Sequence, residues 1–265
     1  MRRTLKSLLE PWKPDSITIM LWKMSLLLFI FAQCFFSSYI IAFLPSSERD
    51  FDEPVVLVDL VIDFIYALDV MLNFKIAFYH QGELCLDPSV IAKNYMSSYF
   101  IIDLISMLSI IGRFLLDTKL RVLVLIALLR VVHFPQLLAK IEDYFQFSRQ
   151  VSTLFQLGKL VMAIILFAHW CGCILYSVAR VESGETWITE AGLNPDELDS
   201  IYVACLYWAI ATMSTIGYGD IHPTSFRERV MSIIIMIASS IIFGYILSSI
   251  GSLLVEINAY NSAQR

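Results

Sequence analysis

The chain of 265 residues is 58% apolar and only 16% charged, and its mean hydropathy is +0.70. A soluble domain of this length cannot bury so much apolar surface. The net charge of −5 argues against a generally basic nucleic-acid-binding protein. The five cysteines are odd in number and lie mostly in apolar runs, so we interpret them as packing residues rather than as disulfides or metal ligands. The composition predicts a polytopic membrane protein.

Six apolar segments are long enough to cross a bilayer, which needs about 20 residues per helix. Three of them contain charged side chains, each of which costs at least ~2.5–3.5 kcal/mol in hydrocarbon, so these charges should face one another or water. The charge-free segments are 24–44, 160–179 and 230–255, and the charged ones are 55–78, 95–111 and 122–138. We therefore expect an all-α membrane protein with six transmembrane helices packed as a bundle.

The connecting segments predict the orientation of these helices. Lysines and arginines are concentrated in 1–20 and in 140–159, whereas 45–53 and 180–199 are mainly acidic. Because cytoplasmic loops are enriched in basic residues, we expect both termini in the cytoplasm. The N-terminus lacks the pattern of a cleavable signal peptide, so the first span should act as its own insertion signal.

The fourth span has part of the pattern of basic residues that a voltage sensor needs. A register of three starting at Arg121 reaches Arg130 and His133, but the positions between the arginines are apolar. One charge crossing the whole field is worth ~2.3 kcal/mol per 100 mV, and steep gating uses about three to four charges per subunit. We therefore expect shallow voltage dependence or none; the alternative is that the two arginines only neutralise buried aspartates. His133 either titrates near neutral pH or packs as a neutral side chain. Pro135 should kink or break the helix.

The most specific motif lies between a short apolar segment, 201–213, and the last span. That segment is too short to cross and predicts a re-entrant helix, whose C-terminal end would favour a cation. Backbone carbonyls after it can replace the water of K⁺ if an extended stretch turns them toward one axis, which glycine permits. One chain brings one such stretch, so we expect a tetramer. The expected K⁺ ligands are Thr215, Ile216, Gly217 and Tyr218, supported by Gly219 and Asp220.

These motifs resemble the superfamily of channels with a cyclic-nucleotide-binding domain, which includes hyperpolarisation-activated, cyclic-nucleotide-gated, ether-à-go-go and plant inward-rectifying members. The segment 215–220 looks like the potassium-channel signature, and His169–Cys173 looks like the His-Trp-x-Gly-Cys of that superfamily. The segments around Asp63 and Asp103 and the entry to the first span also resemble it, so the likeness runs over residues 14–258. Hyperpolarisation-activated members usually have cysteine at the position of Thr215, which favours the potassium-selective members.

The resemblance implies roles for further residues. Asp63, Asp69 and Asp103 would be the acidic partners of the voltage sensor, and Phe243 and Leu247 would form the inner gate. Gly244 and Gly251 would be hinges of the last span, although small residues also serve close helix packing. The implied divisions are an N-terminal segment 1–20, a voltage-sensor-like domain of four helices 21–140, a linker 141–152, a two-helix pore domain 153–257, and the start of a cytoplasmic linker 258–265.

The function we expect is a potassium-selective channel subunit. We do not expect an enzyme, because the sequence has no catalytic constellation, metal-ligand spacing or Walker loop. Its partners would be further copies of itself and membrane lipid, in the plasma membrane, and K⁺ would be permeant rather than a cofactor. Cyclic nucleotide would act only through a domain of a longer chain. Two alternatives stay open: a weakly selective Na⁺/K⁺ channel, and a non-conducting structural subunit.

Overall fold

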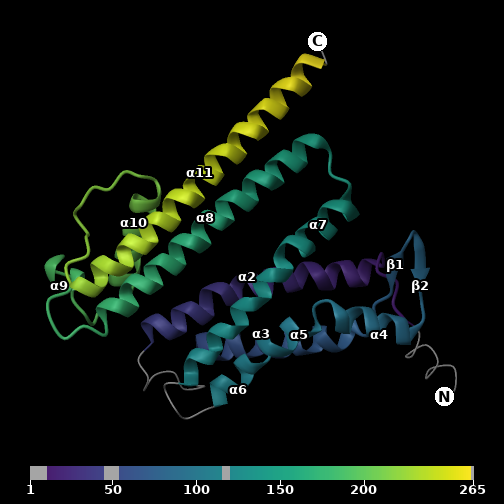
Figure 1. Cartoon of the computed structure of the whole chain (residues 1–265), viewed down its shortest axis with the longest axis horizontal. Coiled ribbons are helices and arrows are strands. Elements are labelled where there is room, and N and C mark those ends of the chain that lie inside the picture. Colours follow the sequence, from purple (N-terminus) through teal and green to yellow (C-terminus); the bar gives the residue numbers. More distant parts are fainter. Residues whose placement is uncertain (1–10, 45–53, 115–119, 264–265) are drawn as a thin grey trace. The chain divides into compact units, whose positions relative to one another are not determined.

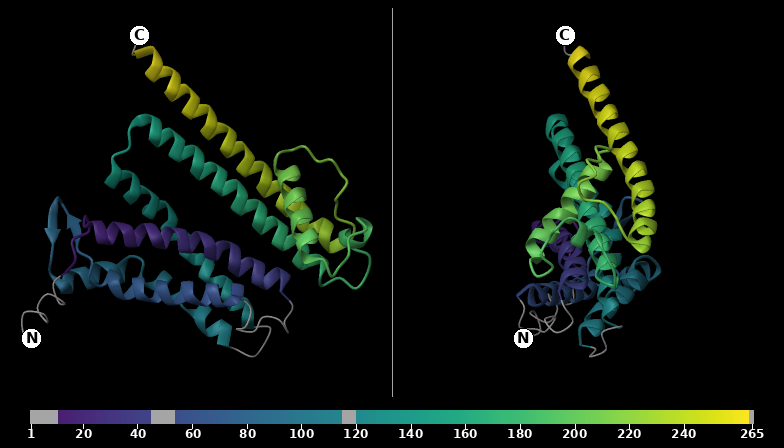
Figure 2. Two further views of the ribbon diagram at one scale, coloured as in Figure 1. Left: turned by 180° about the vertical axis from the view of Figure 1, so that it is seen from behind. Right: turned by 90° about the vertical axis from the view of Figure 1, so that its left-hand side faces the viewer.

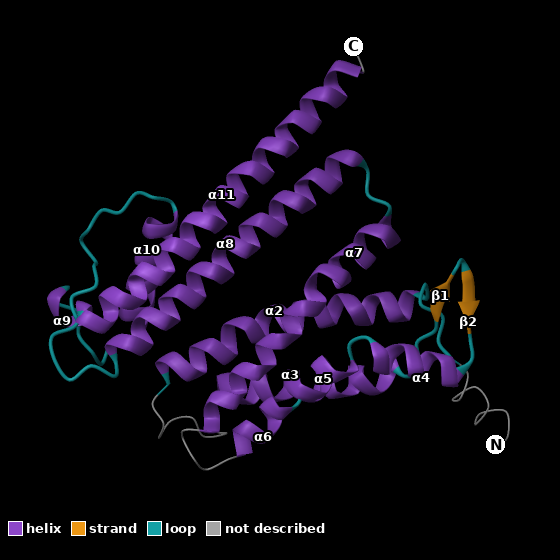
Figure 3. Cartoon of the chain, viewed as in Figure 1, coloured by secondary structure: helices purple, strands orange, loops and turns teal. Residues whose placement is uncertain are grey.

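The computed structural model describes residues 11–44, 54–114 and 120–263 of the chain. The chain consists of two compact units, Met1–Gln146 and Phe147–Arg265. The described residues are mostly helical, as the sequence predicts, and loops and one short hairpin connect the helices (Figure 3).

The first unit is a bundle of helices in which α2 and α3 lie side by side (Figure 1). The fourth-span helix η1 contacts α2, α5 and α6, so it lies among the others rather than at an edge. The elements are α2 (Ile17–Phe43), α3 (Pro54–Asn73), β1 (Phe78–His80), β2 (Glu83–Cys85), α4 (Pro88–Ser97), α5 (Phe100–Ser106), α6 (Leu108–Phe114), the 3₁₀-helix η1 (Leu120–His133) and α7 (Phe134–Phe145).

Burial in this unit is opposite to that of a soluble bundle. Polar side chains from α2 and α3, including Gln33, Asp59 and Asp63, are completely or almost completely buried, whereas Leu28 and Met71 on the same two helices are exposed. Apolar side chains facing outward and carboxylates facing inward are what a hydrocarbon environment favours. The expectation that charged spans turn their charges toward one another is confirmed for this unit.

The third apolar segment, for which the sequence predicts a span over 95–111, is bent rather than one continuous helix. α4 ends at Ser97, α5 begins at Phe100, and the two helical pieces differ in direction by 67°. Ser98 has φ −107° and ψ −87°, outside the helical region, and its hydroxyl donates to the carbonyls of Asn94 and Tyr95. A serine hydroxyl that bonds the preceding turn competes with the backbone and favours a bend there.

The fourth span changes helix type in its course. Residues 120–133 form a 3₁₀-helix, an unusual length for this conformation. Pro135 then lies in the first turn of α7, where its missing N–H removes no intrahelical hydrogen bond. Pro135 therefore marks the change to α-helix and does not end the span, which reaches Phe145. Side chains three apart are aligned in a 3₁₀-helix, so positions 124, 127, 130 and 133 share one side.

Four helices of the described residues are long and apolar enough to cross a membrane, and a fifth span results if the bent pair α4–α5/α6 is one. α3 is 20 residues long, about 30 Å at 1.5 Å per residue, which is enough to cross a membrane. It is not one of the four because its three aspartates make it too polar. The helical membrane class is thus confirmed, and the six-span count is supported only in part. The four long apolar helices are Ile17–Phe43, Val124–Phe145, Val151–Ala179 and Phe226–Val255.

The second unit consists of two long antiparallel helices with a short helix packed against both near one end (Figure 2). Gly172 allows the close approach of α8 to α10, because a Cβ at this position would lie 3.1 Å from the Cβ of Cys205. The helices are α8 (Arg149–Ala179), α9 (Trp187–Glu190), α10 (Leu198–Met213) and α11 (Phe226–Ala263).

Candidate functional site

The segment after α10 has an alternating backbone. Thr215, Gly217 and Gly219 have positive φ values of 62°, 56° and 81°, and the intervening Ile216 and Tyr218 have negative ones. Alternation of left- and right-handed dihedral angles turns successive carbonyls toward one side of the chain, the arrangement by which a filter replaces the hydration shell of K⁺. Thr215 holds this conformation although it is β-branched, and such strain is typical of functional segments.

Contacts from α10 hold the segment in place. The amides of Ile216 and Gly217 both donate to the carbonyl of Ala211, at 3.0 and 3.1 Å. The ring of Tyr207 lies parallel to that of Tyr218, with centroids 6.3 Å apart, and its hydroxyl donates to Asp220 at 2.8 Å. One tyrosine of the short helix thereby supports both the centre and the end of the segment.

The hydrogen bond from Tyr207 also affects the charge at the end of the segment. It lowers the pKa of the Asp220 carboxyl below its ordinary value, since a hydroxyl donor stabilises the carboxylate form. Asp220 is exposed and therefore keeps a negative charge beside the segment into mildly acidic solution.

A buried carboxylate joins the start of α11 to α9. Glu228 is fully buried and accepts from the backbone amides of Thr224 at 2.9 Å, Ser225 at 3.0 Å and Trp187 at 3.3 Å. The Ser225 hydroxyl accepts from the amide of Glu228 in return, which makes a reciprocal capping box. Sequence reasoning missed this residue, although the Ser-x-x-Glu spacing at the start of the last span was a usable signal.

The His-Trp-x-Gly-Cys motif of α8 lies against α10. His169 Nδ1 is 2.8 Å from the hydroxyl of Tyr202, and the sulfur of Cys173 lies 3.5 Å from His169 Nε2. Together with the close contact at Gly172, these interactions fix the short helix that carries the segment 215–220. The motif thus has a structural role, which its resemblance to the superfamily motif did not by itself predict.

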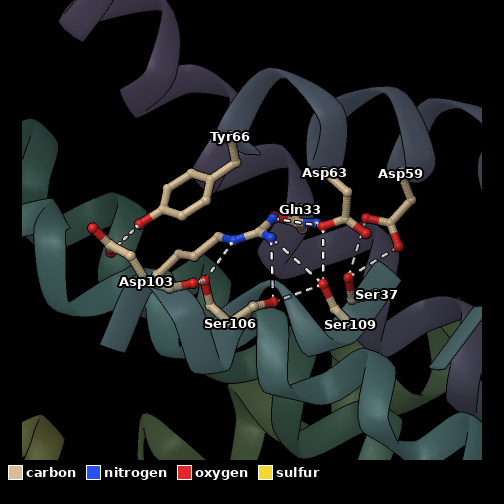
Figure 4. Close-up of polar contacts among 9 residues, drawn as sticks. Gln33, Ser37, Asp59, Asp63, Tyr66, Asp103, Ser106 and Ser109 are labelled. Atoms are coloured by element: carbon tan, nitrogen blue, oxygen red, sulfur yellow. Dashed lines mark hydrogen bonds and ion pairs between the residues drawn. The ribbon is translucent and has the colours of Figure 1, made fainter. Parts of the chain in front are cut away.

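The first unit contains a buried charge cluster centred on Arg130, whose side chain is 0% exposed. Its Nη1 lies 2.6 Å from Asp63 Oδ1 and 2.5 Å from Gln33 Oε1. Figure 4 shows Asp63, Gln33, Ser106 and Ser109 converging on the guanidinium group. The ring of Tyr66 covers the group at 4.1 Å, a cation–π contact that further compensates its desolvation.

The other two predicted acidic partners contact different basic side chains. Asp103 lies 2.6 Å from His133 Nε2 and accepts from the hydroxyls of Tyr66, at 2.8 Å, and of Tyr95. Asp69 binds Lys23 of α2 at 2.8 Å and accepts from the indole N–H of Trp22 at 2.7 Å.

The predicted set of sensor residues is therefore brought together only in part. Arg130 meets Asp63, while Asp69 pairs with Lys23 of the first span and Asp103 with His133. The side chain of Arg121 lies outside the described residues. Lys23 and Gln33 were missed because a lone polar residue in an apolar run gives no signal of which neighbour it will meet.

The predicted gate and hinge residues all lie on α11, which runs as one helix through them. Leu247 is exposed, and Phe243 is half-buried, within this chain. A Cβ at Gly244 or Gly251 would meet nothing within 4 Å, so close packing within this chain does not require either glycine.

Comparisons with known proteins identify the family of this chain. Residues 19–262 match the family model for ion transport proteins. The chain is 26% identical over 264 residues to the potassium voltage-gated channel unc-103 of Caenorhabditis elegans, covering 88% of this chain and 31% of that protein. It is 30% identical over 240 residues to a human voltage-gated delayed rectifier potassium channel, covering 77% and 23%.

A third relative is the potassium voltage-gated channel protein eag of Drosophila melanogaster, 26% identical over 273 residues, covering 90% of this chain and 22% of that protein. The chain thus spans less than a third of the length of these relatives. The match to the family model covers most of the chain and confirms the resemblance inferred from its motifs. The chain belongs to the ion transport protein family, among relatives that are voltage-gated potassium channels of the ether-à-go-go type, and it is not an enzyme.

Proposed function

We propose that this chain is a pore-forming subunit of a potassium-selective channel. The observation that carries the proposal is the alternation of positive and negative φ over residues 215–219, next to a short helix whose C-terminal end directs its partial negative charge toward the same segment. The relatives named above are potassium channels, which supports K⁺ as the permeant ion.

Four copies of the chain would assemble around the segment. Ile216 is 56% exposed and Tyr218 70% exposed in the single chain, a large apolar exposure directly at the proposed ion site. Neighbouring subunits would cover these side chains, and four strands of carbonyls would surround each ion. The ion would shed its water because the oxygens of Thr215, Ile216, Gly217 and Tyr218 replace it.

The proposed topology has six spans with both termini in the cytoplasm of a plasma-membrane protein. α3 would be the second span, since its buried aspartates bind partners inside the bundle and its exposed side chains are apolar. The pair α4–α5/α6 would be the third. The basic N-terminal segment and the acidic segment 180–199 support this orientation.

Gating would occur at the inner end of α11. Phe243 and Leu247 are four residues apart and share a face, so four copies could close the pore by excluding water. Gly244 and Gly251 would allow α11 to bend during opening. A cyclic-nucleotide-binding domain in a longer chain would act on this helix.

Voltage would bias the gate only weakly. Arg130 is a permanently charged residue of the described part of η1, and Arg121 would add a second. Two charges per subunit are fewer than the three to four of steeply gated channels. The fully buried Arg130–Asp63 pair would serve mainly to hold the bundle together.

A flux assay on purified protein in liposomes tests the proposal. Vesicles loaded with K⁺ and diluted into a large impermeant cation should develop a K⁺ diffusion potential that draws in a cationic dye, whereas vesicles loaded with Na⁺ should not. Equal dye uptake by the two kinds of vesicle would favour the weakly selective channel, and no uptake by either would favour the structural subunit. Cross-linking of the same sample should stop at four chains.

A further inference from the structure

The C-terminal end of η1 carries a histidine where an aligned arginine would continue the row of charges. His133 follows Arg130 by three residues, so the two lie on one side of the 3₁₀-helix. Its side chain is 15% exposed, against 0% for Arg130, and its Nε2 lies 2.6 Å from Asp103 Oδ1. His133 is thus the more accessible of two aligned basic side chains, each in contact with an aspartate.

A polar cavity of about 90 Å³ adjoins the His133–Asp103 pair. This volume is large enough for water, since one water molecule occupies about 30 Å³ of the liquid, and the lining offers hydrogen-bond partners. Its lining includes Lys23, Asn73 and Lys140. Asn73 is the last residue of α3, and Trp12 of the N-terminal segment pairs with Ile76 just beyond it.

The charged and titratable groups around His133 come from every neighbouring element. Three of them are basic, two are acidic, and three are tyrosine hydroxyls. Within the described residues they are Lys23 of α2, Tyr66 and Asp69 of α3, Tyr95 of α4, Tyr99 and Asp103 at α5, Arg130 of η1 and Lys140 of α7.

The hydrogen bonding fixes where a proton would bind. Asp103 accepts from Tyr66 and Tyr95, so it faces His133 as an acceptor, and Nε2–H of the imidazole donates to it. A further proton is then transferred from hydronium to Nδ1, which forms an N–H bond, breaks one O–H bond, and leaves water and an imidazolium. The product is an ion pair with Asp103, like the one that Arg130 makes with Asp63.

We propose that His133 and Asp103 form a proton-binding site, reached by water from the cytoplasm, through which cytoplasmic pH sets the charge and position of the fourth span. The proposal rests on the channel function and orientation proposed above. Protonation would add one charge per subunit to a helix that has at most two arginines. If one position of the helix binds the proton about tenfold more tightly, the equilibrium between positions changes up to about tenfold per subunit with pH.

The experiment measures open probability in inside-out patches at fixed voltage while cytoplasmic pH is changed from 8 to 6. The open probability of the wild-type channel should change several-fold, and the same change of external pH should have little effect on it. His133→Gln should abolish the response because it keeps a hydrogen-bond donor but cannot bind a proton. His133→Lys should hold the channel near its acidic behaviour at all pH values. His80→Gln, on the exposed hairpin, is the matched control and should respond like the wild type.

A second measurement keeps this proposal separate from the channel function. The imidazole signals of isotope-labelled protein in lipid nanodiscs are titrated by NMR, and the signal lost in His133→Gln is assigned to His133. Titration between pH 5 and 8 supports the site even if no current is recorded. A His133 signal that stays unchanged over this range, or a pH response that persists in His133→Gln, overturns the proposal.

Discussion

Arg130 and Asp63 form an ion pair of 2.6 Å in which both side chains are completely buried. The pair joins η1 to α3, and Gln33 of α2 and the serines of α5 and α6 complete the hydrogen bonds of the guanidinium group. Removing one member would leave the other charge buried without its partner, which typically costs about 3–5 kcal/mol.

We therefore predict that Arg130→Gln and Asp63→Asn each destabilise the first unit strongly. The double variant should lose much less free energy of unfolding than the sum of the two single losses. Unfolding of the purified protein in detergent, followed by tryptophan fluorescence, measures the three free energies. Arg227→Gln is the control, because its contact with Glu182 is exposed and long at 3.8 Å and such pairs contribute about 0–1 kcal/mol. Additive losses in the double variant would contradict the pairing.

Gly217 is the second testable position, since its φ of 56° is unfavourable for any residue with a Cβ. Alanine there costs roughly 1–2 kcal/mol in backbone strain, so Gly217→Ala should lose K⁺ flux. A Cβ at Gly158 in α8 meets nothing within 4 Å, so Gly158→Ala should keep full flux and gain about 0.5–1 kcal/mol of stability. Wild-type flux in Gly217→Ala would mean that the alternating backbone is not the conducting element.

The hydrogen bond between Tyr207 and Asp220 gives a prediction about external acid. It lowers the pKa of Asp220, so the carboxylate should persist to a lower pH with the bond than without it. In Tyr207→Phe, the negative charge of Asp220 should be lost at a higher external pH than in the wild type. The inward current that this charge favours should fall at the same higher pH. Tyr79→Phe removes a hydroxyl that bonds Asp15, a carboxylate remote from the segment in sequence, and should leave the acid response unchanged. Identical acid titrations of Tyr207→Phe and wild type would contradict this.

Glu228 should be needed for the stability of the second unit. Glu228→Ala leaves the amides of Thr224, Ser225 and Trp187 without their buried acceptor, and each unsatisfied group costs about 1–3 kcal/mol. Glu228→Gln keeps an acceptor oxygen and should lose much less. Thermal unfolding of the two variants gives the comparison, and equal losses would show that the capping contacts contribute little.

Voltage dependence tests the count of charges on η1. Open probability between −150 and +100 mV should follow a shallow curve, equivalent to fewer than about eight charges per tetramer. The recording is made at constant cytoplasmic pH, because the charge of His133 is proposed to vary with it. A steep curve at high pH would mean that charges outside η1 move in the field.

Local patterns predicted much of this structure, and pairings between helices were the part they could not predict. The short helix before 215–220 and the long last span follow from apolar run length and the position of glycine. The bend at Ser98 depends on one hydroxyl, and composition does not distinguish it from a helical serine. The partner of Asp69 turned out to be Lys23, 46 residues away, because three-dimensional packing rather than sequence spacing decides which buried charges meet.

The measurement that tests the central claim most directly is the reversal potential of single channels with K⁺ on one side of a bilayer and Na⁺ on the other. Conduction through four aligned 215–218 segments predicts a reversal potential far toward the K⁺ equilibrium value, lost together with the current in Gly217→Ala. A reversal potential near zero, or K⁺-selective current that survives this substitution, would contradict the account.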